Sequence, residues 1–236
     1  MAHRRQVLLA WSGGKDAAWT LHVLRQRADV EVVGLLSTIS ADDGRASMQG
    51  VSRAVLRAQA QAAGLPLLEA EVSAGSDNAT YLDRLAEGLA DAAERWPGLY
   101  TLAFGDLLLA DVRAWREAEM ARLGWRIETP LFGADTAALA RAMLQGGLHA
   151  SLCCVDTQQL DAGFAGRPFD AELLSVLPET ADPCGENGEF HTCVHAGPMF
   201  DTPLPLAPGA TWLRDGRFAV TDFVLPAGAA ARPDPG

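Results

Sequence analysis

The sequence lacks the features that mark several classes of protein. Its four cysteines form no C-x-x-C pair, so neither a zinc site nor a disulfide framework is indicated. No stretch is long and apolar enough to span a bilayer. The first apolar run is interrupted by glycines and charges and has no small-residue cleavage site after it, which argues against a secretory signal. We therefore expect a cytoplasmic protein with no membrane partner.

Positive charge is also scarce. The 236 residues carry a net charge of −11, and the sequence pI is about 4.8. Clustered Lys and Arg are needed for sequence-independent binding to nucleic acids or anionic membranes, so we expect neither as a broad partner. A local basic pocket for a nucleotide remains compatible with this charge. The hydrophobic content of 49% is sufficient for the core of one large domain or two small ones.

Two common phosphate-binding motifs are missing as well. The chain has no Walker loop before its first helix and no G-x-G-x-x-G dinucleotide fingerprint there. It has instead an apolar run at residues 7–11, which is too short for a buried helix and is bounded by turn residues. The pattern predicts a central parallel strand, a tight turn and a helix. The turn consists of Ser12, Gly13, Gly14, Lys15 and Asp16.

This turn has the composition of an anion site. The small residues 12–14 let a ligand approach the backbone, and we expect their amides to be free at the start of the helix, where an anion is favoured. Lys15 adds a mobile positive charge suited to phosphate, and Asp16 could hold Mg²⁺ or accept hydrogen bonds in the first turn. The alternative interpretation is an ordinary tight turn with a surface lysine.

Strand and helix patterns then alternate without a break. This alternation predicts an α/β fold of the Rossmann-like kind, with a parallel five-stranded sheet and helices on both faces. Ligands in such sheets bind at the carboxyl ends of strands, where the turn, Thr38, Gly105 and Asp106 fall. The expected strands are residues 7–11, 30–37, 67–72, 100–104 and 125–129, and the helices between them include residues 51–63, 78–95 and 111–123.

The composition changes after Pro130, where we place a domain boundary. Residues 1–130 are the expected nucleotide domain, and residues 131–225 a smaller α+β domain. The second part is predicted to contain helices at 136–144 and 170–177, a strand at 148–155, and hairpins and loops beyond. Residues 226–236 are poor in bulky apolar side chains and predict a disordered tail.

A second dense group of polar residues lies at 182–192. Loops that carry such groups are more often sites than packing elements. Glu186 and Glu189 could bind Mg²⁺ or orient an amine, and His191 could move a proton near neutral pH. Cys184 could be a nucleophile if its thiolate were stabilised. The alternative is a hairpin turn at Asn187-Gly188, which could also present the charged groups.

Several other residues have two interpretations each. Asp106 could bind Mg²⁺ or a ribose hydroxyl, or only cap a helix. Thr38 could contact adenine or only end a strand. Arg113 and Arg167 could clamp a phosphate or an acceptor carboxylate, or form surface pairs. The Cys153-Cys154 pair, in an apolar strand, is predicted to be core.

Five motifs, in their order along the chain, resemble those of the diphthine–ammonia ligase family, also called the ATP-binding domain 4 family, within the PP-loop ATP pyrophosphatases. The resemblance spans about residues 7–200 and is closest to the bacterial branch. It departs at Asn187 and His191 within the second motif and at Gln49, where relatives often have His. The motifs are residues 12–16, Gly105-Asp106 with Arg113 and Glu117, Pro130-Leu131, Gly166-Arg167 with Asp170, and residues 185–192.

The resemblance implies an adenine nucleotide alpha hydrolase-like domain followed by an acceptor domain, and an ATP-dependent, amide-forming activity. A carboxylate would be adenylated with release of pyrophosphate, and ammonia or an amine would displace AMP. Our leading hypothesis makes Lys15, Glu186, Glu189 and His191 catalytic, and Asp16 and Asp106 the Mg²⁺ ligands. The expected nucleotide-binding residues are Ser12, Gly13, Gly14, Lys15, Asp16, Thr38, Gly105, Asp106 and Arg113.

Two other functions stay open. The chain could bind or sense an adenine nucleotide without ligation, or it could carry out another PP-loop reaction such as thiolation, with Cys184 carrying sulfur. The acceptor, the source of ammonia and the oligomeric state, a homodimer included, are not determined by the sequence. Diphthamide is not expected in bacteria, so the ATP half of the resemblance transfers better than the acceptor.

Overall fold

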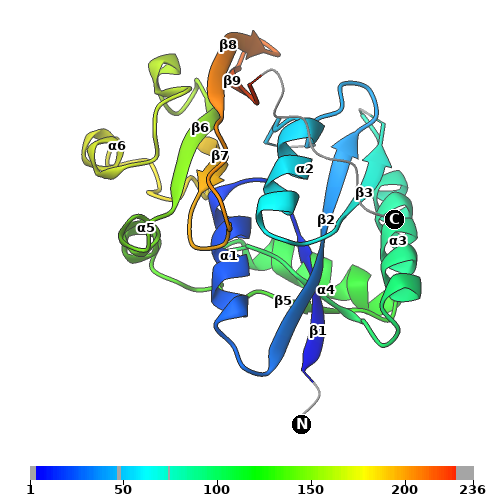
Figure 1. Ribbon diagram of the computed structural model, residues 1–236. Helices are drawn as coiled ribbons and strands as arrows, with labels where there is room; N and C mark the ends of the chain where they lie inside the picture. The colour runs from blue at the N-terminus through cyan, green and yellow to red at the C-terminus, as the bar shows by residue number, and fades with distance from the viewer. Residues whose placement is uncertain (1–3, 47–48, 74, 227–236) are drawn as a thin grey trace.

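The computed structural model describes residues 4–46, 49–73 and 75–226 and contains two sheets (Figure 1). The expected tail lies outside the described residues apart from Pro226. The elements of the first sheet are β1 (Arg5–Ala10), α1 (Lys15–Arg25), β2 (Val30–Ser40), α2 (Arg53–Ala62), β3 (Leu67–Val72), α3 (Asn78–Arg95), β4 (Thr101–Ala103), α4 (Ala110–Arg122) and β5 (Arg126–Glu128).

The first sheet has the strand order β3-β2-β1-β4-β5, and all its strand pairs are parallel. Side chains that alternate along β1 enter different cores: Val7 and Leu9 pack with α1 and α2, whereas Leu8 packs with α3 and Met120 of α4. The central strand β1 is therefore apolar on both faces, as a strand covered by helices on both sides requires. The expected fold class is confirmed.

The strand order reverses at β1, because β2 lies on one side of it and β4 on the other. At such a switch point the segments that leave neighbouring strands diverge and open a crevice at the carboxyl end of the sheet. The turn after β1 and the segment after β4 both start there. Gly105 packs directly on this turn, since a Cβ atom added to it would lie 2.8 Å from the Asp16 carbonyl carbon.

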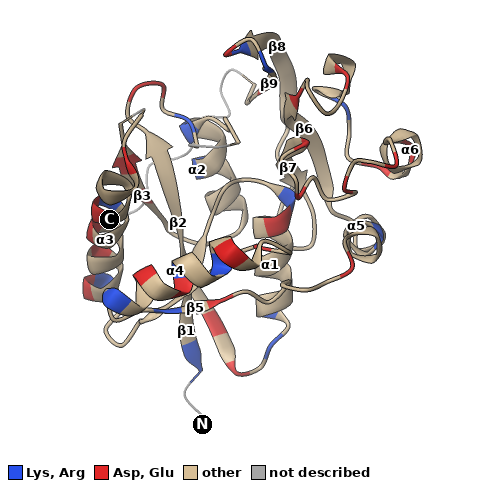
Figure 2. Ribbon diagram, turned by 180° about the vertical axis from the view of Figure 1, so that it is seen from behind, with Lys and Arg blue, Asp and Glu red and all other residues tan. Residues whose placement is uncertain are grey.

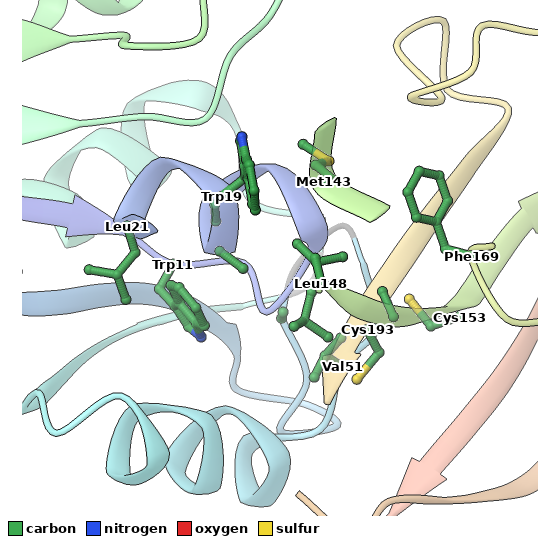
Figure 3. Close-up of a cluster of buried hydrophobic side chains, with 14 of the residues drawn as sticks. Trp11, Trp19, Leu21, Val51, Met143, Leu148, Cys153, Phe169 and Cys193 are labelled. Atoms are coloured by element: carbon green, nitrogen blue, oxygen red, sulfur yellow. The ribbon is translucent and has the colours of Figure 1, made fainter. Parts of the chain in front are cut away.

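The second sheet is antiparallel and has the order β7-β6-β9-β8. Its core is continuous with that of the first sheet. Figure 3 shows Trp11, Trp19 and Val51 from the first part in one cluster with Met143, Leu148, Cys153 and Cys193 from the second. The elements are α5 (Thr136–Gln145), β6 (His149–Asp156), the 3-10 turn η1 (Ala162–Phe164), α6 (Ala171–Val176), β7 (Phe190–Ala196), β8 (Ala207–Arg214) and β9 (Phe218–Val224).

This shared cluster bears on two sequence-based expectations. Cys153 and Cys154 are both buried, so their prediction as core residues is confirmed. The predicted boundary near Pro130 stays a prediction, since side chains from both sides of it share one core. Within the described part of the chain, no helix combines the length and apolar character needed to cross a membrane.

Asn187-Gly188 does not form a hairpin. It lies in a turn that leads into β7, and no strand directly precedes it. The tight hairpin of this region is instead β8–β9, which turns at Asp215-Gly216 with φ angles of 53° and 64°. Two successive left-handed residues match the right-handed twist of paired strands, and Asp-Gly supplies them at low strain.

Candidate functional site

The turn between β1 and α1 is held by buried polar contacts from distant elements. The carbonyl of Gly13 accepts hydrogen bonds from Gln59 Nε2 at 3.0 Å and from the Val194 amide at 2.9 Å. Trp11 Nε1 in turn donates to Gln59 Oε1 at 3.1 Å. Gly13 has a φ of +79°, and a Cβ atom there would meet Gln59 Oε1 at 2.8 Å. The turn therefore requires glycine both for its conformation and for its close packing.

We expect Gly13→Ala to destabilise the protein by about 2 kcal/mol or more, because it combines left-handed strain with a steric clash. Gly44→Ala is the matched control: its φ is +66°, but open space surrounds the new Cβ atom. It should lose only the conformational contribution, about 1 kcal/mol. Denaturant unfolding of the two variants measures the difference, and equal losses would show that packing at Gly13 contributes nothing.

The Gly14 amide is not free, contrary to the expectation for residues 12–14, and the Lys15 amide is not free either. The Gly14 amide donates to Ser12 Oγ at 3.3 Å, and the Lys15 amide donates to Thr192 Oγ1 at 3.0 Å. Thr192 belongs to β7, and its carbonyl would lie 3.2 Å from a Cβ atom on Gly14. The local pattern could not reveal this, because the partner strand is about 180 residues away in the chain. The first turn of α1 is therefore covered by the second sheet.

Lys15 is the only lysine in the sequence, and its side chain is buried, not on the surface. Its Nζ lies 2.8–2.9 Å from the carboxylate oxygens of Asp16 and also donates to the carbonyl of Cys184. Burial alone would lower the pKa of Lys15, but the nearby charges of Asp16 and Glu186 outweigh it and raise the pKa above its ordinary value. The ammonium is thus held in its charged form between the two segments.

The loop at residues 182–189 is organised around two carboxylates. Glu189 is 1% exposed and accepts hydrogen bonds from the Asp182 amide at 2.7 Å, the Asn187 amide at 2.9 Å and the Asn187 side chain at 3.0 Å. Asp182 in turn accepts from the Cys184 amide at 2.7 Å and from Thr136 Oγ1 at 2.6 Å. These bonds fix the backbone that presents the Cys184 carbonyl to Lys15.

Glu186, in the same loop, has a raised pKa. Burial, together with the charges of Asp16 and Asp182, raises the pKa of Glu186 to about 7, although Lys15 and the Leu108 amide act in the opposite direction. A carboxyl group with a pKa near neutrality can both accept and donate a proton under physiological conditions.

Cys184 and His191 are both uncharged near neutral pH. Burial raises the pKa of Cys184 to about 12, and the thiol lies 3.3 Å from the Thr136 carbonyl. Burial and the positive charges of Lys15 and Arg214 lower the pKa of His191 to about 4. Cys184 is therefore a thiol and not a thiolate, and His191 is a neutral imidazole.

A second polar cluster lies beside the turn, on β2, α3, α4 and the segment after β4. Asp106 forms an ion pair with Arg116, whose guanidinium lies over the Phe104 ring. Tyr81 contacts this pair electrostatically and forms a hydrogen bond with Thr38, and burial raises the pKa of Tyr81. The structure thus brings Thr38 close to Asp106. Neither Tyr81 nor Arg116 was identified from the sequence, because no local spacing links them to Asp106.

Asp106 Oδ2 is buried and has no hydrogen-bond partner among the described residues. An unpaired buried carboxylate oxygen fits a cation or a ligand hydroxyl. Asp16 also has a carboxylate near the turn, but it is paired with Lys15. In the part of the chain that the structure describes, no three His, Cys, Asp or Glu side chains gather as metal ligands. Asp106 and Asp16 therefore fit Mg²⁺ only as a partial set of ligands. Phosphate oxygens and water would supply the others.

Arg113 and Arg167 each lie over an aromatic ring. Arg113 is on α4, its guanidinium stacked 4.5 Å from the Phe132 ring. Arg167 pairs with Glu172 at 3.3 Å and lies over Phe164. A surface pair was one of the interpretations left open for Arg167, and the structure favours it.

Comparison with known proteins gives a family match and a distant structural match. The family described as "Diphthamide synthase N-terminal domain" matches residues 5–127, which is more than half of the chain. Among curated proteins, none matches. One solved structure that matches is described as a predicted subunit of tRNA methyltransferase from Methanocaldococcus jannaschii. It is 14% identical, with a TM-score of 0.39, and the match covers 68% of this chain and 84% of that chain.

The family match includes the first sheet except for the last residue of β5, and it contains the turn at residues 12–16 and the Asp106 cluster. The segment at residues 182–192, which supplies Glu186 and covers the turn, lies outside it. The match implies use of ATP. By its sequence and by the parallel sheet that carries the turn, this chain belongs to the diphthamide synthase N-terminal domain family.

Proposed function

We propose that the protein is an ATP-dependent, amide-forming ligase. A carboxylate oxygen attacks the α phosphorus of ATP and pyrophosphate leaves. The nitrogen of ammonia or an amine then attacks the acyl carbon, AMP leaves, and the proton lost by the nitrogen passes to a base. The observation that carries this proposal is the position of Glu186, with a pKa of about 7, next to Lys15 and Asp16 at the switch point of the sheet.

The nucleotide would lie at the turn after β1. Ser12, Gly13, Gly14 and Lys15 contact the β and γ phosphates, Thr38 and Gly105 line the nucleoside side, and Asp16 and Asp106 are the carboxylates that would hold Mg²⁺. The metal would neutralise charge on the departing pyrophosphate. Binding requires the Lys15 ammonium to exchange Asp16 for phosphate and the Lys15 amide to exchange Thr192 Oγ1 for a phosphate oxygen.

Glu186 acts as the general base. Its carboxyl group accepts the proton from the attacking nitrogen, because its pKa matches neutral pH. His191 acts as a neutral hydrogen-bond partner, since its pKa of about 4 leaves it uncharged. Glu189 supports the reaction by holding the loop that carries Glu186.

The second candidate is an adenine-nucleotide-binding protein without ligase activity, and the covered turn favours it. The Gly14 and Lys15 amides already have partners within the chain. This candidate predicts nucleotide binding with no pyrophosphate release, and tolerance of changes at Glu189 and His191. The thiolation alternative is disfavoured, because a sulfur carrier needs a thiolate and the pKa of Cys184 is about 12.

The single lysine allows a direct test. Protein labelled with ¹⁵N only in lysine gives one backbone amide signal, that of Lys15. We expect ATP with Mg²⁺ to shift this signal saturably and a small-molecule extract to support conversion of ATP to AMP and pyrophosphate. A signal that does not move at millimolar ATP would refute both nucleotide-based candidates. A shift without AMP formation would leave only the binding protein.

The pH dependence tests the role of Glu186. Acceptor-dependent AMP formation should rise through pH 7 as Glu186 loses its proton. Glu186→Gln should remove this inflection and lower the rate by roughly 100-fold or more. His191→Gln should keep the inflection, because the pKa of His191, about 4, lies below the tested range. An inflection that persists in Glu186→Gln would assign it to another group.

The same substitution has a consequence for stability. The pKa of Glu186 is higher in the folded protein than its ordinary value, so its favourable contribution is complete below about pH 4.5 and is lost as the pH rises to about 7. Glu186→Gln should therefore be more stable than the parent protein at pH 8 and should show less change between pH 5 and pH 8.

A further inference from the structure

An open hollow of about 320 Å³ lies along one face of α4. Four of its lining residues follow the i, i+3, i+4, i+7 spacing of a single helix face, and Phe132 closes the opposite side. Met120 is the only buried residue of α4, so this face is not used for packing in the core. The volume lies at the lower end of the range for small-molecule sites. The lining residues are Ala110, Arg113, Ala114, Glu117 and Phe132.

The hollow contains two opposite charges that do not pair with each other. Arg113 Nε is buried and has no hydrogen-bond partner among the described residues, and its guanidinium carbon lies over the Phe132 ring, 4.5 Å from the centroid. Glu117 is exposed and, within the described ranges, forms no ion pair with Arg113 or with another cation. A stacked guanidinium with an unpaired buried donor is suited to a planar carboxylate. Figure 2 shows that α4 carries both basic and acidic segments along its length.

The hollow begins next to the proposed reaction centre. Ala110 follows by two residues Leu108, whose amide forms a hydrogen bond with the Glu186 carboxylate. The segment with Phe132 is fixed to the same place, because the Gly133 amide donates to the Leu107 carbonyl at 2.8 Å. A molecule in the hollow would therefore lie beside the loop that carries Glu186.

We propose that this hollow binds the acceptor, and that the acceptor is a small zwitterion with a carboxylate on Arg113 and a cationic amine on Glu117. The inference deepens the proposed ligase activity and rests on it. The sequence left a phosphate and an acceptor carboxylate open as the partner of Arg113, and this proposal takes the acceptor carboxylate in place of the nucleotide contact. Side chains at i and i+4 of a helix have Cβ atoms about 5–6 Å apart, which sets the separation of the two charged groups of the ligand.

The test uses 4-aminobutanoate as the probe, with butanoate and butylamine as single-charge controls. Binding to the full chain is measured by NMR titration without ATP, so that the outcome does not depend on ligase activity. We expect saturable millimolar binding of 4-aminobutanoate and weaker binding of both controls. Arg113→Gln should weaken 4-aminobutanoate and butanoate at least tenfold, whereas Glu117→Gln should weaken 4-aminobutanoate and leave butanoate unchanged.

Arg122→Gln is the matched control, because Arg122 lies on the same helix but is paired with Glu119 and is exposed. It should bind the probe as the parent protein does. Equal binding by Arg113→Gln and the parent, or no saturable binding of 4-aminobutanoate, would overturn the acceptor site. Failure of the ligase proposal gives a different result, namely intact probe binding with no AMP formation from any acceptor.

Discussion

Replacing Lys15 with methionine is expected to lower ATP turnover strongly and to destabilise the fold at the same time. Lys15 is the only lysine and is buried between Asp16 and the Cys184 carbonyl. Removal of the ammonium leaves Asp16 and Glu186 near each other without a counterion. Breaking a buried ion pair in this way costs about 3–5 kcal/mol. Loss of the positive charge beside the phosphates should lower AMP formation by roughly 100- to 1,000-fold, as for other groups that stabilise developing charge.

A second variant tests the origin of the loss of stability, although it also removes Asp16, a proposed Mg²⁺ ligand. The double variant Lys15→Met with Asp16→Asn removes the unpaired negative charge along with the ammonium. We expect it to recover much of the stability in denaturant unfolding but none of the AMP formation. If turnover returned with stability, Lys15 would matter only for folding. If Lys15→Met retained full turnover while folded, the proposed phosphate contact would be refuted.

Glu189→Ala is expected to have the second-largest effect. The Glu189 carboxylate is 1% exposed and accepts three hydrogen bonds from Asp182 and Asn187. Its removal leaves the part-buried backbone amides of Asp182 and Asn187 without their acceptor, at a cost of about 1 kcal/mol each. The loop should loosen, and with it the position of Glu186. We therefore expect a lower unfolding temperature together with a fall in AMP formation of at least tenfold.

The pH profile distinguishes support of the loop from direct chemistry. If Glu189 acts by positioning Glu186, the inflection near pH 7 should move toward the ordinary pKa of a glutamate, because Glu186 becomes more exposed to water. If Glu189 itself reacts, the rate should fall with the inflection unchanged. Glu179→Ala is the control, since Glu179 lies shortly before this loop in the sequence and its side chain is exposed. It should change neither the stability nor the profile.

The parallel sheet could be predicted because its signals are local. The strands β1, β2 and β4 contain short apolar runs, and the helices α2 and α3 are amphipathic. The strands of the second sheet were harder to predict, and β8 shows why. Seven of its eight residues are exposed, so it has no alternation of apolar and polar side chains. Its stability depends on pairing with β9, which is visible only in three dimensions.

Two dipeptides with a hairpin signal also show that local sequence does not decide which strands pair. Asn187-Gly188 and Asp215-Gly216 both carry the sequence signal of a hairpin, but only the second connects two paired strands. The first lies in a loop whose backbone amides are taken by the carboxylates of Asp182 and Glu189. A turn signal fixes local dihedral angles, whereas the flanking segments decide which partners they find.

The sequence by itself determined the sheet, the place of the turn after β1 and the grouping of polar residues at 182–192, because periodicity and turn chemistry act over a few residues. Only the tertiary structure decided that β7 covers this turn, that Lys15 is buried and that Glu186 titrates near pH 7. These properties arise from desolvation and from charges brought together by chain segments about 170 residues apart. No local pattern encodes such distances.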